Sequence, residues 1–164
     1  MNYISVIPET ITDGEGIRLS IYVAGCHHHC YKCHNPQTWD FNAGSLLTED
    51  IIDVLINQVK NNPIMSGITF SGGDPLAYEN AKDLLCFLKK IKDNNINVWC
   101  YTGYKIEELI EKNSPQKDCL FYIDKLVDGE FENDKRTLDI PFVGSSNQRI
   151  IDVTKWLQQN NINQ

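Results

Sequence analysis

The feature that most constrains the fold of this chain is an alternation of short β-prone runs with amphipathic helical segments. The helical segments repeat their apolar residues every three to four positions, and the first three β-prone runs lead into glycine-containing turns. Strand-helix-strand units form right-handed crossovers, which bring the carboxyl ends of parallel strands to one edge of a sheet. We therefore predict a mainly parallel α/β sheet with outer helices. The predicted strands are 17–24, 67–71, 96–102, 125–127 and 149–153, and the predicted helices are 48–62, 78–94 and 105–112.

Length and charge exclude several classes of protein. The 164 residues suffice for a single domain, 1–164, but fall short of the about 250 residues of a closed eight-fold α/β barrel. A formal net charge of -7 provides no broad basic surface for nucleic acid or for an anionic membrane. No run of roughly 18 apolar residues is present, and the first ten residues lack the basic flank of a signal peptide. We therefore expect a cytoplasmic protein with no nucleic-acid or membrane partner.

Each chemically unusual motif of the chain follows directly after a predicted strand. Ligands in parallel α/β folds bind at the carboxyl ends of the strands, so these motifs are expected to converge on one composite site. The motifs are Cys26-His-His-His-Cys30-Tyr-Lys-Cys33, Ser71-Gly-Gly-Asp-Pro75 and Tyr101-Thr-Gly-Tyr104.

The cysteine triplet Cys26, Cys30 and Cys33 is the strongest of these signals. Cysteines three to four positions apart on a loop can direct their thiolates at one iron-sulfur or zinc centre. A cubane cluster normally takes four thiolates, so a triplet without a nearby fourth cysteine leaves one iron open to a small-molecule ligand. The other cysteines, Cys86, Cys100 and Cys119, are interpreted as small buried apolar residues.

A structural zinc site is the alternative interpretation of the triplet. The three thiolates and one imidazole would make a Cys₃His set, with the imidazole from His27, His28, His29 or His34. A chain of this length does not need a metal to fold, and a zinc knuckle does not require the glycine turn after the next strand. The three successive histidines are predicted to be exposed loop residues.

The glycine turn is a candidate binding loop. Gly72 and Gly73 would let a ligand approach the backbone, and Asp74 offers an acceptor for an ammonium group. The same letters also describe an ordinary strand-to-helix turn, with Asp74 as the helix cap and Pro75 in the first helical position. The 101–104 and 126–129 segments would add a hydroxyl and a carboxylate at the same edge for a ribose or a partner, or serve as turns.

Taken together, the chain resembles the radical S-adenosylmethionine superfamily and, within it, the activating proteins of anaerobic ribonucleoside-triphosphate reductases. The resemblance covers nearly the whole chain. Its motifs are Asp13-Gly-Glu-Gly-Ile-Arg18, the Cys-x₃-Cys-x₂-Cys triplet, Asn35 with Thr38-Trp-Asp-Phe41, Ser71-Gly-Gly-Asp-Pro-Leu76, Tyr101-Thr-Gly-Tyr104, Val127-Asp-Gly129 and Gly144-Ser-Ser-Asn-Gln-Arg149.

The resemblance implies a partial (β/α)6 barrel whose open side meets a large partner. It implies a [4Fe-4S] cluster on Cys26, Cys30 and Cys33, and S-adenosyl-L-methionine chelated on the open iron. The residues implied in binding this cofactor are Lys32, Cys33 and His34 against the adenine, Gly72, Gly73 and Asp74 at the amino group, and Thr102 at the same edge. Here the place before the third cysteine, often aromatic in the superfamily, is Lys32, so contact with adenine is expected through the backbone.

The implied activity is that of a radical S-adenosylmethionine oxidoreductase. An electron from a reduced donor such as flavodoxin would enter the cluster and cleave the cofactor to methionine and a 5'-deoxyadenosyl radical. That radical would take a hydrogen atom from a glycine of the catalytic subunit of anaerobic ribonucleoside-triphosphate reductase. An activase for another glycyl-radical enzyme, of the pyruvate formate-lyase type, and a non-catalytic zinc-binding module are the alternatives.

Overall fold

A computed structural model describes residues 1–111 and 114–163 of the chain. Its centre is an open seven-stranded sheet in the order β3-β1-β2-β4-β5-β6-β7. The strands are β1 (Asn2–Thr10), β2 (Ile17–Val23), β3 (Ser45–Leu46), β4 (Met65–Gly72), β5 (Val98–Tyr101), β6 (Lys125–Asp128) and β7 (Arg149–Asp152). The helices are α1 (Glu49–Asn61), α2 (Tyr78–Asp93), α3 (Ile106–Ile110), α4 (Pro115–Leu120) and α5 (Val153–Gln159), with short 3-10 turns at Pro36–Thr38 and Asn133–Lys135.

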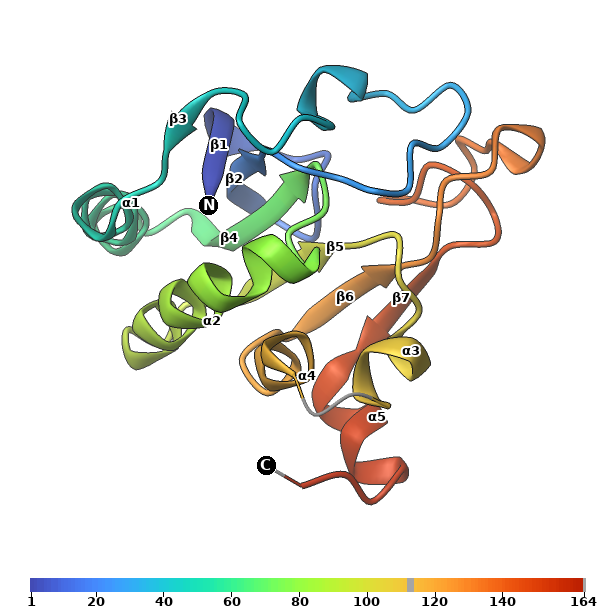
Figure 1. Cartoon of the computed structure of the whole chain (residues 1–164). Coiled ribbons are helices and arrows are strands. Elements are labelled where there is room, and N and C mark those ends of the chain that lie inside the picture. Colours follow the sequence, from blue (N-terminus) through green and yellow to red (C-terminus); the bar gives the residue numbers. More distant parts are fainter. Residues whose placement is uncertain (112–113, 164) are drawn as a thin grey trace.

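The predicted parallel sheet is present at the centre of the molecule. Strands β2, β4, β5 and β6 pair in parallel, so their carboxyl ends lie at one edge. In Figure 1 the segment after β2 and the segment after β6 come together beside this edge. All five predicted strands and all three predicted helices are found within a few residues of their expected bounds. Lys112, the last residue of the third predicted helix, lies outside the described residues.

The outer strands at both edges of the sheet run antiparallel to their neighbours, unlike the predicted parallel pattern. Strand β1 pairs with both β2 and β3 in antiparallel fashion, and β7 runs antiparallel to β6. The physical reason at β7 is the connection, because a parallel partner needs a crossover helix and the 129–148 segment carries only the Asn133–Lys135 turn. The protein is thus a mixed α/β fold with an open sheet, and the implied partial (β/α)6 barrel is not confirmed.

Helices α1 and α2 form where the apolar spacing predicts them. Thr48 caps α1 by accepting a hydrogen bond from the Ile51 N–H, as expected from the sequence. Both helices bury one face against the sheet, and α2 also packs against α4 (Figure 1). Among the described residues, no helix has both the length and the apolar character needed to cross a bilayer.

A buried arginine joins the central strands below the site. Arg18 on β2 is 1% exposed, and its guanidinium donates to the Thr69 hydroxyl at 2.7 Å and to the carbonyls of Ile68 and Asn97 at 2.9 and 3.2 Å. It also lies over the ring of Trp99. One side chain therefore links β2, β4 and the segment that enters β5, which fixes the relative positions of the three strands that carry the candidate site.

Candidate functional site

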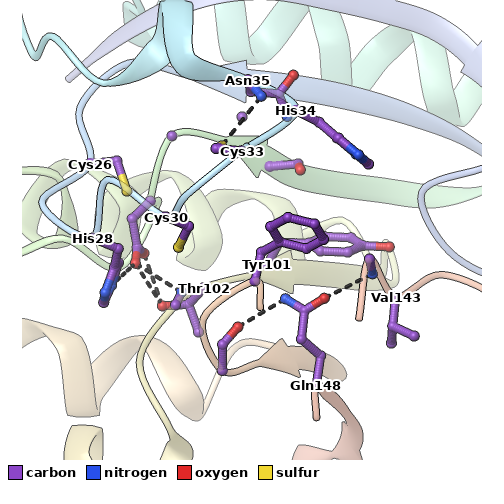
Figure 2. Close-up of a pocket in the computed structure, with 18 of the residues that line it drawn as sticks. Cys26, His28, Cys30, Cys33, His34, Asn35, Tyr101, Thr102, Val143 and Gln148 are labelled. Atoms are coloured by element: carbon purple, nitrogen blue, oxygen red, sulfur yellow. Dashed lines mark hydrogen bonds and ion pairs between the residues drawn. The ribbon is translucent and has the colours of Figure 1, made fainter. Parts of the chain in front are cut away.

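One cavity of about 430 Å³ lies at the carboxyl edge of the parallel strands. Figure 2 shows residues of this cavity from the loops after β2 and β5 facing residues of the segment after β6. We call the lining from residues 12–39, 71–74 and 101–103 the inner wall, and the lining from residues 129–148 the outer wall. The three motifs that follow the predicted strands all contribute to the inner wall, so the structure brings them together as expected.

The three cysteines of the triplet all line this cavity and are half-buried free thiols. Their loop is held at its base by the segment that follows it. The Gly25 N–H donates to the Thr38 carbonyl at 2.7 Å, and the Cys26 N–H donates to the Trp39 carbonyl at 3.1 Å. A Cβ at Gly25 would lie 2.0 Å from the Phe41 ring. The 38–41 segment therefore has a structural role that fixes where the cysteine loop starts.

The thiols suit an iron-sulfur cluster in their number and setting. Burial raises the pKa of the Cys26 thiol to about 11 and also raises the pKa of Cys30, so a cluster bound there would have to displace the thiol protons. Cys33 Sγ accepts the Asn35 N–H at 3.3 Å, a contact that stabilises sulfur charge. Among the residues described, no three His, Cys, Asp or Glu side chains form a site for a single metal ion.

Two of the three remaining cysteines are buried as predicted, and one is exposed. Cys100 in β5 and Cys119 in α4 are buried, as expected for small apolar residues. Cys86 is exposed on the outer side of α2, so the prediction that it is buried was wrong. Its helical position explains the error, because Cys86 lies off the one buried face of α2, which Leu84, Phe87 and Leu88 mark.

The histidines that follow Cys26 also differ from the prediction. His27 and His29 are exposed, as expected, and His29 stacks on Trp39. His28 is not an exposed loop residue, since its side chain is only 11% exposed. Its Nε2 lies 2.9 Å from Asp74 Oδ2, and its Nδ1 lies 2.9 Å from Glu130 Oε1.

The glycines of the turn after β4 are needed for packing. A Cβ at Gly73 would lie 2.5 Å from the Gly25 carbonyl oxygen, and one at Gly72, where φ is +95°, would meet the backbone of β2 at 2.9 Å. The Gly73 N–H donates to the Val23 carbonyl, and the Asp74 N–H donates to the Gly25 carbonyl at 2.7 Å. The glycine turn and the cysteine loop are thus joined back to back through their main chains.

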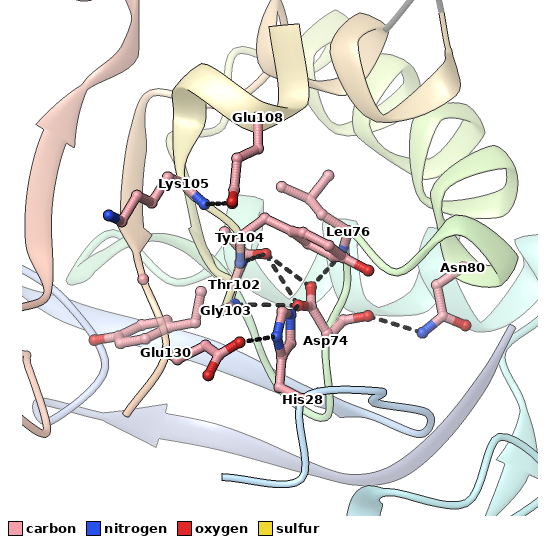
Figure 3. A network of polar contacts seen from close by, with 12 residues as sticks. His28, Asp74, Leu76, Asn80, Thr102, Gly103, Tyr104, Lys105, Glu108 and Glu130 are labelled. Carbon is pink, nitrogen blue, oxygen red and sulfur yellow. Dashed lines mark hydrogen bonds and ion pairs between the residues drawn. The ribbon is translucent and has the colours of Figure 1, made fainter. Parts of the chain in front are cut away.

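Asp74 lies at the centre of a polar network beneath the cavity, shown in Figure 3. It is 1% exposed and accepts hydrogen bonds from the Leu76 N–H, the Gly103 N–H and the Thr102 hydroxyl. The hydrogen bond to Asp74, with a second one to Glu130, raises the pKa of His28 to about 9. The helix that follows begins at Tyr78 with Ala77 as its cap, so Asp74 does not act as the helix cap.

The other predicted cofactor-binding residues are divided between cavity and surface. Cys33, His34, Gly72, Gly73, Asp74 and Thr102 all line the cavity. Lys32 does not line it, because this residue adopts a positive φ of 56° and its ammonium lies over the exposed Tyr31 ring. His34 packs beside Phe131 of the outer wall at a ring distance of 5.4 Å.

The outer wall includes Gly144 and Gln148 of the Gly144-to-Arg149 motif, which carried the resemblance but to which the sequence assigned no role at the site. Gln148 holds its two ends together, since its carbonyl oxygen accepts the N–H groups of Gly144 and Ser145 and its amide donates to the Gly129 carbonyl at 2.9 Å. Tyr101 of the inner wall donates its hydroxyl to the Phe142 carbonyl at 2.9 Å. Further lining residues are Phe131, Arg136, Thr137, Leu138 and Val143. No periodic signal marks them, because they lie in irregular structure.

The carboxylate expected from the 126–129 segment faces a different space. Asp128 is buried and binds the guanidinium of Arg149, which also pairs with Glu107. It lines a second, polar cavity of about 550 Å³, which shares His28, Gly103 and Gly129 with the first. The ring of His28 therefore stands where the two cavities adjoin.

The chain matches known proteins over most of its length. Residues 12–151 match a family described as "4Fe-4S single cluster domain". Among curated relatives, the anaerobic ribonucleoside-triphosphate reductase-activating protein of Haemophilus influenzae is 38% identical over 92% of this chain and 97% of its own length. The protein with the same description from Escherichia coli strain K12 is 38% identical over 90% of this chain and 96% of its own length.

A more distant relative is found in a virus. The anaerobic ribonucleoside-triphosphate reductase-activating protein of Enterobacteria phage T4 is 32% identical over 92% of this chain and 93% of its own length. The match to the cluster domain favours an iron-sulfur centre over the zinc alternative for the cysteine triplet. The chain therefore belongs to the family of anaerobic ribonucleoside-triphosphate reductase-activating proteins, with a 4Fe-4S single cluster domain.

Proposed function

We propose that this protein is a radical S-adenosylmethionine enzyme that generates the glycyl radical of an anaerobic ribonucleoside-triphosphate reductase. The observation that carries the proposal is the shared cavity, in which the thiols of Cys26, Cys30 and Cys33 face the same space as the glycine turn and Thr102. The reductase is the partner because the relatives are described as its activating proteins.

In the proposed site the three thiolates hold a [4Fe-4S] cluster and leave one iron for S-adenosyl-L-methionine. The cavity offers the required donor set, namely three half-buried thiols and a backbone N–H at Cys33 Sγ. When bound, the two groups together supply reductive cleavage of a carbon-sulfur bond and a 5'-deoxyadenosyl radical that abstracts hydrogen from glycine.

The chain's own residues bind and orient the cofactor. We assign the amino group of S-adenosyl-L-methionine to Gly72, Gly73 and Asp74, whose carboxylate is an acceptor for an ammonium group. Thr102 lies at the same edge, and Cys33 and His34 provide the wall for the adenine. Lys32 contributes only its backbone in this arrangement, since its side chain lies over Tyr31.

The walls of the cavity also exclude water from the reacting atoms. Phe131, Phe142 and Val143 give the outer wall an apolar lining opposite the cysteines. This lining leaves the glycine of the partner a dry approach to the site. Placement and dryness are the contributions of the protein, because the cofactor carries the difficult step.

Four further assignments complete the proposal. The four parallel strands correspond to part of a superfamily-type partial (β/α)6 barrel. Residues 1–164 act as a single domain. A reduced donor of the flavodoxin kind supplies the electron, and the protein works in the cytoplasm, where thiols stay reduced.

Anaerobic reconstitution tests the proposal. We expect about four irons and four sulfides per chain, and a change in the electron paramagnetic resonance spectrum of the reduced protein when S-adenosyl-L-methionine is added. Incubation with the reductase should then produce a glycyl radical signal. Zinc without sulfide would instead identify a binding module, and a radical formed only on a pyruvate formate-lyase type enzyme would identify a different partner.

A further inference from the structure

The carboxylate of Asp74 has no acceptor position to spare. Its Oδ1 accepts from the Leu76 N–H at 2.9 Å, and its Oδ2 accepts from the Gly103 N–H at 3.1 Å and from His28 Nε2 at 2.9 Å. The Thr102 hydroxyl lies 2.9 and 3.1 Å from the two oxygens. Four donors saturate the roughly four lone-pair positions of a carboxylate. An ammonium group can therefore bind Asp74 only if one of these donors leaves.

Three of the four donors are fixed by the fold. Two are main-chain N–H groups, and the Thr102 side chain is buried with its oxygen also accepting the Tyr104 N–H at 3.2 Å. His28 differs from them because its ring comes from the cysteine loop (Figure 3). The ring lines both cavities. Two side chains, those of His28 and Thr102, lie within hydrogen-bond distance of Asp74, and of these His28 alone has a second carboxylate partner. That partner is Glu130, whose side chain is more than half exposed.

The ring of His28 packs closely between Gly103 and Tyr104, two residues that also line the second cavity. Gly103 has no side chain, and a Cβ there would lie 2.4 Å from the ring of His28. The ring packs edge-on against Tyr104 at 4.6 Å, on the side of the second cavity. Both ring nitrogens lie 2.9 Å from a carboxylate oxygen, Nε2 from Asp74 and Nδ1 from Glu130. The bond from Nδ1 to Glu130 gives the ring a partner after Nε2 has left Asp74.

We propose that His28 competes with the amino group of S-adenosyl-L-methionine for Asp74 and thereby sets the apparent affinity for that cofactor. This inference rests on the proposed function, which assigns the amino group to Asp74. A competitor from the chain itself holds the binding-competent state at a fraction of the population, and the apparent dissociation constant rises in inverse proportion to that fraction. Removal of the competing ring should therefore tighten binding, whereas loss of a residue that positions the cofactor would weaken it.

The test is a titration of S-adenosyl-L-methionine into the reduced, cluster-loaded protein, followed by the change in its electron paramagnetic resonance spectrum. His28→Phe keeps a ring against Tyr104 but cannot bond Asp74. We expect half-maximal change at about tenfold lower cofactor concentration than in wild type. His28→Ala is the second variant, and iron and sulfide content is measured for each protein to show equal loading.

The matched control is His27→Phe in the same loop, because His27 pairs with Glu79 at the surface and does not touch Asp74. Its midpoint should equal that of wild type. Unchanged or weaker binding in both loaded His28 variants would overturn the inference and leave the proposed function standing. A wild-type protein whose spectrum does not respond to the cofactor would overturn the proposed function, and the inference with it.

Discussion

The two walls of the cavity are built in different ways. The inner wall is joined by main-chain hydrogen bonds, such as Gly73 N–H to Val23 and Asp74 N–H to Gly25, and by glycines that leave no room for a Cβ. The outer wall bonds mainly to itself, and its ties to the inner wall are made by side chains such as Tyr101. Leu138 of the outer wall is 90% exposed. The comparison indicates a rigid side, to which the proposed function assigns cluster and cofactor, and a side-chain-tethered side opposite it.

The largest expected effect separates the cysteines of the inner wall from the others. Cys26→Ala, Cys30→Ala or Cys33→Ala should each abolish retention of the cluster, because each removes one of three thiolate ligands. Iron and sulfide analysis after anaerobic purification measures this. Cys86→Ala is the control, since Cys86 lies exposed on α2 and should leave the cluster in place. Equal loss in that control would contradict the division of the cysteines.

A pair of glycine substitutions compares the stiffness of the two walls. Gly73→Ala places a Cβ 2.5 Å from a backbone oxygen, so we expect the free energy of unfolding to fall by about 2 kcal/mol. Gly144→Ala in the outer wall meets the side chains of Phe131 at 3.0 Å and Gln148 at 3.4 Å, and should cost below about 0.5 kcal/mol because side chains can move. Denaturant titration of the two variants measures both losses in the free energy of unfolding. Similar losses in both would show that the walls are equally rigid.

Removal of the Gln148 side chain, which holds the two ends of the outer wall together, should alter function more than stability. Gln148→Ala frees the Gly144 and Ser145 N–H groups and the Gly129 carbonyl, at a cost of about 1 kcal/mol in the free energy of unfolding. We expect unchanged iron content but slower formation of the glycyl radical on the reductase. Gln158→Ala on the exposed side of α5 serves as the control. Loss of iron from Gln148→Ala would show that the outer wall also supports the cluster.

The smallest expected effect is on the free energy of unfolding at low pH, and it concerns the ion pair of Arg149 with Glu107 at the end of the outer wall. Hydrogen bonds from Arg149 lower the pKa of Glu107 below its ordinary value of 4.5. The lowered pKa adds to the free energy of unfolding at pH values above the ordinary pKa. This contribution is lost as the pH falls through the lowered pKa of Glu107. The stability difference between wild type and Glu107→Gln should shrink from about pH 6 to about pH 3. Glu111→Gln, an exposed neighbour, should follow wild type; an unchanged difference for Glu107→Gln would argue against the ion pair.

The inner wall was predictable because its elements carry periodic or positional signals. The apolar spacing of α1 and α2 gave both helices, and the parallel order of β2, β4 and β5 followed from the helices between them. That order alone placed the cysteine loop beside the glycine turn. Strand β1 was missed because its exposure does not alternate and it contains Pro8.

The outer wall and the neighbours of Asp74 were not predictable from the pattern. Gln148 acts on main-chain groups of an irregular segment, and a contact of this kind leaves no repeat in the sequence. The pairing of His28 with Asp74 joins residues 46 positions apart, so it depends on how the loop folds back. The position of the Lys32 side chain over Tyr31, outside the cavity lining, likewise appears only in three dimensions.

The anchoring of the cysteine loop has a consequence for the lifetime of the protein in air. Backbone bonds from Gly25 to Thr38 and from Cys26 to Trp39 hold the base of the loop, and the apolar core is formed by the strands and helices of the sheet. A chain that loses iron to oxygen should therefore remain folded, with its thiols still gathered.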